Sequence, residues 1–453
     1  MTTEQILNSQ RAFFKKGETF DVDFRLTQLK KLKQSICENM RPLVQAFKED
    51  YNKCEFDVYS TEVGMVMHEL NYMIRNIKKF ARPRYVSTSL INLFSRAKIV
   101  SVPLGAVLIV SPWNYPFQLT MCPVIGAMAG GNTLIIKPSS KTPRVSEVIA
   151  KIMSVFDTEY AYVNCNRDEG LFDLKFDFMF YTGGSEFAKK IREKQAKYLT
   201  PCILELGGKS PCIVDIDADI DLAAKRIAWG KFLNAGQTCV APDYCVLHED
   251  IKKDFVEKLF YYIKKFYYDG EALSDDFPYV ITKQKIDEIT KLIEGEKILF
   301  GGKIDGRKME PTVLGDITFD SAIMQEEIFA PVLPILEFNK LTDLLMQLEE
   351  REKPLAFYYF SKSTAAGKYI AQNTISGGAC INDTLMHLTE INLPFGGVGE
   401  SGYGSYHGKK SYDAFVHYRS VLVKGDKEIE LKYPPYNKSK LTFIKNYFKI
   451  DDR

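Results

Sequence analysis

Apolar residues recur with helical spacing through the first part of the chain. In LTQLKKLKQSICENMRPLVQAFKEDY they return every three or four positions, with charged residues between them, which is typical of amphipathic helices. TEVGMVMHELNYMIRNIKKFAR continues this pattern and stops before Pro83, a residue that a helix does not readily continue into. We therefore predict that residues 3–80 are mostly helical.

After residue 101, short apolar runs alternate with helical patterns. VPLGAVLIVSPWN, NTLIIKP, FDFMFYTGG and CILELGG each end in a turn or in glycines, as buried strands do. Strands that alternate with helices indicate a parallel sheet covered on both faces, whose ligands gather beyond the carboxyl ends of the strands. We expect one rim of the sheet to hold the residues that follow these runs: Trp113, Asn114, Lys137, Gly183, Gly184 and Glu205.

The alternation starts again after Gly207, where we place a domain boundary. DADIDLAAKRIAWGKFLNAGQ predicts a helix, with Asp217 or Asp219 as its candidate N-cap. DYCVLHE, PVLPILEF, AFYYFS and GACIN predict further strands. The whole pattern predicts an α/β fold.

Composition limits the kinds of partner. A chain of 453 residues exceeds the usual size of one core, so two or three domains are expected. Lys and Arg (60) nearly balance Asp and Glu (58), which gives no support for a nucleic-acid partner. Nine cysteines without a CxxC spacing favour a reducing, cytoplasmic setting and suggest no metal site.

The chain shows no signal-peptide core and no apolar run of membrane-spanning length. LKYPPYNKSKLTFIKNYFKI, near the C-terminus, is basic and aromatic, a composition that also suits a membrane surface. We prefer a tail packed on the protein or on a partner subunit, because the charge of the whole chain offers no support for a membrane. No stable membrane anchor is predicted.

Cys239, in NAGQTCVAPD, is the candidate nucleophile. Small and polar residues surround it, and Gly236 and Thr238 would let a substrate approach the sulfur. A thiolate needs a positive environment or a helix start, and no histidine or lysine adjoins this cysteine in the sequence. The residues alone leave a reactive thiol and an inert buried thiol equally open, whereas Cys245, in an apolar strand, shows the buried pattern.

Two polar residues at strand ends could assist such a nucleophile. Glu205 ends an apolar strand before two glycines, and partial burial would raise its pKa toward that of a general base. The alternative is a salt bridge, for example to Lys209. The Asn114 amide suits a developing oxyanion, or it is a turn asparagine that bonds its own backbone.

Other strand ends suit a nucleotide. Lys137 could hold a phosphate or ribose hydroxyls, although a solvated strand end is the commoner case. Gly183 and Gly184 would allow a pyrophosphate to approach a helix start, but no complete GxGxxG is present.

Taken together and in order, these motifs resemble the aldehyde dehydrogenase superfamily, and most closely its class 3 and fatty aldehyde branch. The matching segments are SPWNYPF, IIKPSSKTP, YTGGSEFAKKI, LELGGKSP, NAGQTCVAPDY, QEEIFAPVLP and LPFGGVGESGYGSYHGKKSYDAF. The resemblance implies oxidation of hydrophobic aldehydes to carboxylic acids with NAD or NADP. Cys239 would form a thiohemiacetal and then a thioester, Asn114 and the Cys239 N–H would hold the oxyanion, and Glu205 would activate the hydrolytic water.

The resemblance also assigns the cofactor residues. It implies that Lys137 contacts the adenosine ribose, Glu327 the nicotinamide ribose, and that Phe329 packs near the nicotinamide. On chemistry alone Glu327 is a second candidate base. The full set is Trp113, Lys137, Ser140, Gly183, Gly184, Glu327 and Phe329.

Two positions depart from the family pattern. Ser140 stands where many NAD-preferring relatives carry a glutamate that would repel a 2′-phosphate, so we expect NADP to be accepted, alongside NAD. Gly184 stands where many relatives have serine, which leaves the pyrophosphate contacts open. We expect the reactivity of Cys239 to come from a helix start and from the bound cofactor.

By resemblance, Tyr115, Met121 and His387 line the aldehyde tunnel, and the protein is a homodimer. The expected architecture is a Rossmann-like cofactor domain with N-terminal helices (1–206), an α/β catalytic domain (207–410) and a C-terminal oligomerisation strand and tail (411–453). Residues 83–102 are a candidate part of a small β oligomerisation element.

The sequence leaves three alternative functions to consider. A CoA-acylating aldehyde dehydrogenase would need no base at Glu205. A cofactor-free thiol hydrolase could use the same cysteine and glutamate, but the nucleotide motifs would then lack a purpose. Intact Cys239, Glu205 and Asn114 argue against a catalytically silent binding protein.

Overall fold

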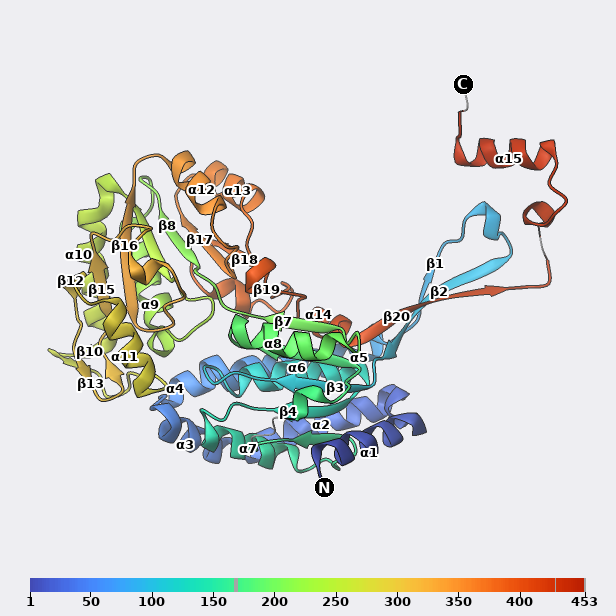
Figure 1. Cartoon of the computed structure of the whole chain (residues 1–453), viewed down its shortest axis with the longest axis horizontal. Helices are drawn as coiled ribbons and strands as arrows, with labels where there is room; N and C mark the ends of the chain where they lie inside the picture. Colours follow the sequence, from blue (N-terminus) through green and yellow to red (C-terminus); the bar gives the residue numbers. More distant parts are fainter. Residues whose placement is uncertain (167–169, 428, 452–453) are drawn as a thin grey trace. The chain divides into compact units, whose positions relative to one another are not determined.

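The computed structural model describes residues 1–166, 170–427 and 429–451, and the chain forms two compact units. The first comprises Met1–Phe80 and Pro103–Val416, and the second comprises Ala81–Val102 and His417–Arg453. The first unit contains two large sheets, each with helices packed against it (Figure 1). The α/β fold that the sequence predicts is therefore present.

The N-terminal region is helical, as the apolar spacing predicts. The segment around residue 39 is divided between two helices because the chain leaves helical geometry at Asn39. Pro42, which has no N–H to donate, lies in the first turn of the second helix, where none is needed. The elements are α1 (Thr3–Lys16), α2 (Val22–Glu38), α3 (Met40–Tyr51), α4 (Glu55–Asp57), the π-helical turn η2 (Val58–Val63) and α5 (Gly64–Phe80).

A six-stranded sheet brings the predicted strand ends together. Its order is β19-β7-β6-β3-β4-β5, and only β19 runs antiparallel to its neighbour. Val110 lies opposite Lys137 and Tyr181, and Thr182 lies opposite Glu205. The carboxyl ends of four strands thus form one rim. The strands are β3 (Ala106–Val110), β4 (Thr133–Lys137), β5 (Ala161–Val163), β6 (Phe178–Thr182), β7 (Cys202–Glu205) and β19 (Gly402–Tyr403).

Helices bury both faces of this sheet. On one face, Ile6 of α1 and Ile191 of α8 (Ser185–Ala196) pack with Leu108 of β3. Helix α6 (Gln118–Gly130) is buried along its whole length and contacts β3, β4, α2 and α5. A helix that is apolar all round suits this central position. Helices α7 (Pro143–Met153) and α14 (Lys409–Ala414) contact β5 and α6 respectively.

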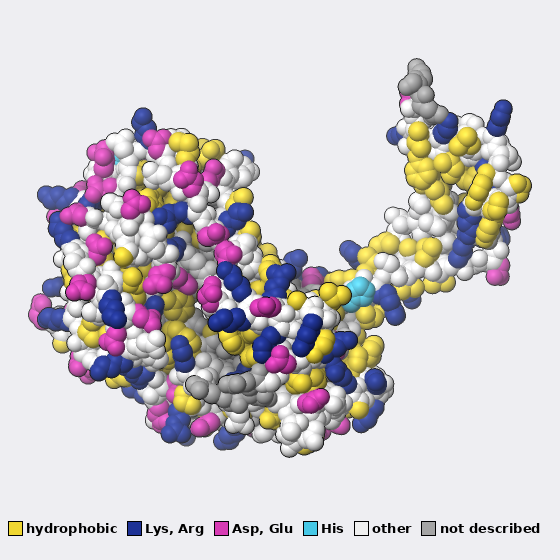
Figure 2. Space-filling model, viewed as in Figure 1, with side chains coloured by type: hydrophobic (Ala, Val, Ile, Leu, Met, Phe, Trp, Pro, Cys, Tyr) yellow, Lys and Arg dark blue, Asp and Glu magenta, His cyan; other side chains and the backbone are white. Residues whose placement is uncertain are grey.

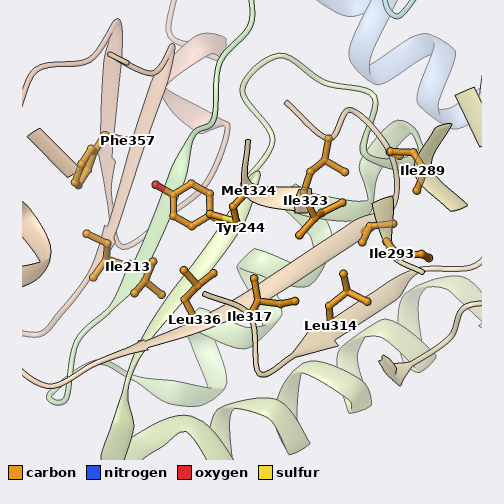
Figure 3. Close-up of a cluster of buried hydrophobic side chains, with 14 of the residues drawn as sticks. Ile213, Tyr244, Ile289, Ile293, Leu314, Ile317, Ile323, Met324, Leu336 and Phe357 are labelled. Carbon is orange, nitrogen blue, oxygen red and sulfur yellow. The ribbon is translucent and has the colours of Figure 1, made fainter. Parts of the chain in front are cut away.

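A seven-stranded sheet forms the other core of the first unit. Its order is β12-β15-β16-β9-β8-β17-β18, and only β12 pairs antiparallel. Ile213, Tyr244, Leu336 and Phe357, from four different strands, belong to one buried cluster (Figure 3). The strands are β8 (Pro211–Val214), β9 (Tyr244–His248), β12 (Lys297–Phe300), β15 (Thr312–Gly315), β16 (Val332–Phe338), β17 (Ala356–Phe360) and β18 (Gly378–Ile381).

Helix α9 (Ile220–Phe232) begins at Asp219, whose carboxylate accepts the N–H of Leu222 at 3.1 Å. Of the two aspartates proposed as its cap, Asp219 is therefore the one that serves. The same part of the first unit contains the helices α10 (Lys252–Tyr267), α11 (Lys283–Leu292), α12 (Leu341–Glu349) and α13 (Thr364–Asn373). It also contains two short antiparallel hairpins, β10 (Tyr268–Asp269) with β11 (Ala272–Leu273) and β13 (Ile304–Asp305) with β14 (Lys308–Met309).

The second unit contains a three-stranded sheet of order β1-β2-β20 and the helix α15 (Lys438–Phe448). Its strands are β1 (Arg84–Val86), β2 (Ser95–Pro103) and β20 (Val416–Lys424). Many large apolar side chains are exposed on it (Figure 2), among them Tyr85, Leu90, Phe94, Leu422, Val423, Leu441, Phe443 and Phe448.

On the face of the first unit that Figure 2 shows, basic and acidic side chains are interspersed. None of the helices in the described parts of the chain is both long enough and apolar enough to span a bilayer. The predicted boundaries after residues 206 and 410 remain predictions.

Candidate functional site

The segment that carries Cys239 turns sharply after α9. In the short helix η5 (Leu233–Gly236), Asn234 and Ala235 both have φ of 53°, and Gly236 has φ of 71°. A Cβ at Gly236 would lie 2.3 Å from the carbonyl oxygen of Ala330, closer than packing allows. The glycine is therefore required for close packing against the chain that follows Phe329. That Gly236 also lets a substrate approach the sulfur remains a prediction.

Cys239 lies in a turn and not at a helix start. The expectation that a helix start makes its thiol reactive is therefore wrong. Buried Gln237 fixes the turn, because its side chain accepts the N–H of Ile281 at 2.8 Å and donates to the carbonyl of Tyr279 at 3.0 Å. The Cys239 side chain is only half-buried, whereas Cys245 is fully buried, as its apolar strand predicts.

The environment of Cys239 keeps its thiol protonated. Burial raises its pKa to about 12, with further increases from the carboxylates of Glu327 and Glu205. Backbone N–H groups of Cys239 and Val240 bond to the sulfur and lower the pKa in part.

Glu205 ends β7 with its side chain 3% exposed. Neither carboxyl oxygen has a hydrogen-bond partner within the described part of the chain, and burial raises its pKa well above the usual value. The alternative of a salt bridge to Lys209 is excluded, because that ammonium contacts the carboxylate of Asp243 and donates to the carbonyl of Glu326 at 2.7 Å. A buried carboxyl without partners is rare unless it serves a function.

Asn114 joins the rim of the six-stranded sheet to the Cys239 turn. Its side-chain amide donates to the carbonyl of Gln237 at 3.1 Å, and its own carbonyl accepts from the amide of Asn234 at 2.9 Å and the hydroxyl of Tyr51 at 3.0 Å. The amide thus bonds a segment 123 residues away, and the alternative of a turn asparagine that bonds its own backbone does not hold.

Glu327 lies near Cys239 on a third segment of the chain. A Cβ at Gly207 would lie 2.0 Å from a Glu327 carboxyl oxygen, so only glycine at position 207 admits the carboxyl. Burial and the charge of Asp243 raise the pKa of Glu327 to about 8, against the effect of a hydrogen bond from the backbone of Gly208.

A cavity of about 960 Å³ opens beside these groups. Gly184, Gly207, Gly208 and Glu327 contribute to its walls. Gly184 begins α8 without a side-chain cap, and a Cβ placed there would meet no atom within 4 Å. An uncapped helix start with free space in front of it suits a pyrophosphate, and the volume suits a dinucleotide.

The other predicted cofactor residues lie along the rim but are not among the described residues that line this cavity. The rings of Trp113 and Phe329 meet edge to face, with centroids 5.4 Å apart. The ammonium of Lys137 donates to the carbonyl of Pro138 at 3.0 Å, and Ser140 is exposed just beyond β4. The N–H of Gly183 donates to the carbonyl of Glu205 at 3.0 Å.

Comparison with known proteins decides the family. The sequence model described as "Aldehyde dehydrogenase family" matches residues 2–421. The chain belongs to the aldehyde dehydrogenase family.

Two relatives and one solved structure match nearly the full length. The chain is 40% identical to "Aldehyde dehydrogenase family 3 member A2" of Mus musculus over 97% of this chain and 93% of that protein. It is 40% identical to "Aldehyde dehydrogenase, dimeric NADP-preferring" of Canis lupus familiaris over 95% of this chain and 97% of that protein. A structure of the substrate-bound state of Staphylococcus aureus AldH superposes with a TM-score of 0.96 at 40% identity, over 99% of this chain and 100% of that one.

The resemblance to the class 3 and fatty aldehyde branch is thus confirmed, and the protein is an NAD(P)-dependent aldehyde dehydrogenase that oxidises aldehydes to acids.

The sequence did not single out a second charged cluster in this dehydrogenase. Asp243 accepts the N–H of Ile328 at 3.0 Å and so fixes the chain beside Glu327. Fully buried Lys231 faces Asp243, Lys209 and Glu327, and burial lowers its pKa to about 8. Asp243 lies in the motif NAGQTCVAPDY, but the distance along the chain between Asp243 and Glu327 gives no sign that the two residues lie close together.

The three candidate substrate residues have different surroundings. The hydroxyl of Tyr115 lies 2.7 Å from that of Thr238, beside Cys239. Met121 is fully buried in α6 and offers no surface to an aldehyde in this conformation. His387 is half-buried, and burial lowers its pKa to about 4. Their role in substrate binding remains a prediction.

Replacement of Glu327 tests the electrostatic control of the thiol. Because the Glu327 carboxylate raises the pKa of Cys239, Glu327→Gln is expected to lower it and to move alkylation of Cys239 to lower pH. The rate of iodoacetamide labelling at Cys239, followed by peptide mass spectrometry without cofactor, measures the shift. Glu326→Gln, one residue earlier and exposed, is the matched control. An unchanged pH profile in Glu327→Gln would contradict this account.

Proposed function

We propose that Cys239 is the nucleophile, Asn114 the oxyanion donor and Glu205 the general base in the oxidation of hydrophobic aldehydes to carboxylic acids. The observation that carries this assignment is Glu205, a buried carboxyl near the Cys239 thiol that has no hydrogen-bond partner among the described residues. Its raised pKa suits a group that must take a proton from water during the reaction.

The reaction begins when the thiol of Cys239 releases its proton to solvent and the sulfur bonds the aldehyde carbon. Negative charge then develops on the carbonyl oxygen, where the Asn114 amide and the Cys239 N–H donate to it. Bound dinucleotide supplies the acceptor for the hydride that leaves this carbon. Cys239 is then held as a thioester.

Glu205 completes the cycle. In its ionised form it takes a proton from a water molecule, whose oxygen bonds the thioester carbon while the carbon–sulfur bond breaks. The carboxylic acid leaves, and Glu205 passes the proton it took from water to the sulfur, which regenerates the thiol. Because burial raises the pKa of Glu205, hydrolysis of the thioester should accelerate as pH rises through the range in which this carboxyl ionises.

The alternatives fit the site less well. Transfer of the acyl group to CoA would leave the buried carboxyl of Glu205 without a purpose. A cofactor-free hydrolase would have no use for the cavity beside Gly184 and Glu327.

Two variants test the assignments. Cys239→Ala is expected to reduce turnover by at least about 10³-fold, because no other group forms the thioester. Glu205→Gln is expected to retain a burst of reduced cofactor and then to slow by about 10²- to 10⁴-fold, because the acyl-enzyme forms but is not hydrolysed.

Stopped-flow measurement of reduced cofactor with a medium-chain aldehyde and no CoA distinguishes these outcomes, and mass spectrometry detects the acyl group on Cys239. Full turnover by either variant would refute the corresponding assignment.

For the cofactor, we propose that NADP is used alongside NAD and that Ser140 permits it. Exposed Ser140 carries no charge that would repel a 2′-phosphate, and one relative is described as NADP-preferring. Trp113, Lys137, Gly183, Gly184, Glu327 and Phe329 complete the proposed site.

Ser140→Glu is therefore expected to reduce kcat/KM for NADP by at least about tenfold through charge repulsion, while NAD is affected much less. Steady-state rates with each cofactor, at low and moderate salt, measure the change. Ser139→Glu, one residue earlier, is the control for added charge alone. Strict use of NAD by the wild-type protein would contradict the proposal.

We propose that the protein is a homodimer and that the second unit contributes to the contact. Its exposed apolar side chains need cover, and one relative is described as dimeric. Sedimentation equilibrium is expected to give twice the chain mass of 51.7 kDa, and a monomer at micromolar concentration would overturn the proposal.

Nine free cysteines support a cytoplasmic location. Recovery of the protein in a secreted or membrane fraction of cells would contradict it.

A further inference from the structure

A buried ion pair, formed by Lys53 and Glu62, contacts the segment that carries Asn114, the proposed oxyanion donor. The ammonium of Lys53 and a carboxyl oxygen of Glu62 are 2.8 Å apart, and both side chains are 0% exposed. Removing two charges from water is costly, and apolar residues of similar size often give equal or greater stability. Stability alone is thus a weak explanation for this pair.

Glu62 is bound to the start of α6. Its second carboxyl oxygen accepts the N–H of Gln118, the first residue of that helix, at 2.8 Å, and the backbone of Phe117 bonds it as well. A carboxylate at this position also favours the helix dipole. Asn114 precedes the helix by four residues, so Glu62 fixes the end of the segment that carries it.

The element that presents Glu62 is unusual. Val58–Val63 forms a π-helical turn, η2, between α4 and α5. Such turns are rare and occur often at functional sites.

Lys53 contacts the aromatic rings around the same segment. Its ammonium lies 4.3 Å from the ring centre of Tyr115 and 5.8 Å from that of Tyr51, within the range of cation–π attraction. The hydroxyl of Tyr51 donates to the carbonyl of Asn114, and that of Tyr115 lies 2.7 Å from the Thr238 hydroxyl.

We propose that Lys53 and Glu62 are positioning residues that hold the Asn114 segment in register with the Cys239 turn. Glu62 fixes the segment at its helical end, and Lys53 holds the two tyrosines whose hydroxyls reach Asn114 and the residue before Cys239. This inference rests on the proposed roles of Asn114 and Cys239. Neither Lys53 nor Glu62 contacts the reacting atoms.

The decisive variant removes both charges together. Lys53→Met/Glu62→Gln leaves no unpaired buried charge, and the introduced amide keeps an oxygen for the helix start, so this double variant is expected to unfold close to the wild-type temperature. Its kcat is expected to fall by about 10- to 100-fold, because small displacements of catalytic groups carry such costs. The KM for aldehyde and the affinity for NADP should change little.

A second measurement is independent of the cofactor. Hydrolysis of p-nitrophenyl acetate by Cys239, without NAD or NADP, uses the same oxyanion donors and is expected to slow by a similar factor. Lys194→Met/Asp173→Asn, which removes an exposed ion pair of 2.9 Å, is the control and should leave both rates unchanged.

Tyr51→Phe provides a variant that leaves the charges in place. It removes only the hydroxyl that holds Asn114, and it should lower kcat by a few-fold at unchanged KM. If the double variant does not fold, the kcat of Tyr51→Phe tests the proposal in its place.

Two results would overturn the inference. One is a folded double variant, or a folded Tyr51→Phe, with wild-type kcat and ester hydrolysis. The other is a rise in the KM for aldehyde with kcat unchanged, which would mean that the pair shapes the substrate pocket. A wild-type protein without any aldehyde or ester turnover would instead contradict the proposed function itself.

Discussion

Parallel pairing of β7, β6, β3 and β4 is the constraint on which the site depends. Parallel strands in register end at the same edge, so Glu205, Gly183, the chain leading to Asn114, and Lys137 reach one rim although they are spread over 92 residues of sequence (Asn114 to Glu205). The Cys239 turn then meets that rim through the Asn114–Gln237 hydrogen bond, and the chain near Glu327 meets the turn through the contact between Gly236 and Ala330. The surroundings of the Cys239 sulfur thus depend on three segments fixed by two sheets.

Desolvation gives the site its electrostatic character. Burial is the largest cause of the raised pKa of Cys239, Glu205 and Glu327. Each negative charge here also disfavours the next, since the two carboxylates raise the pKa of the thiol. A low-dielectric site of this kind disfavours the charged form of each of its acidic groups.

Local patterns were enough to predict the strands, the helices and the rim, because periodicity and turns are encoded by neighbouring residues. They were also enough to select Cys239, Glu205 and Asn114 as candidates once the motifs were considered together. They were not enough for the contacts between distant segments. The helix start expected at Cys239 is absent. Asn234 and Ala235 adopt left-handed geometry and Gly236 packs closely against Ala330, and this tertiary contact cannot be read from neighbouring residues. Lys53 and Glu62 likewise resemble ordinary charges among helices until the fold buries them together.

The first unit buries charge in two distinct ways, and the difference separates structural support from chemistry. Lys53 with Glu62 and Lys209 with Asp243 are buried as ion pairs with additional backbone partners, so their charges are satisfied and their positions are fixed. Glu205, in contrast, is buried without a hydrogen-bond partner among the residues that the structure describes. A protein gains nothing in stability from such a group. A buried group of this kind is retained where a ligand or a water molecule becomes its partner.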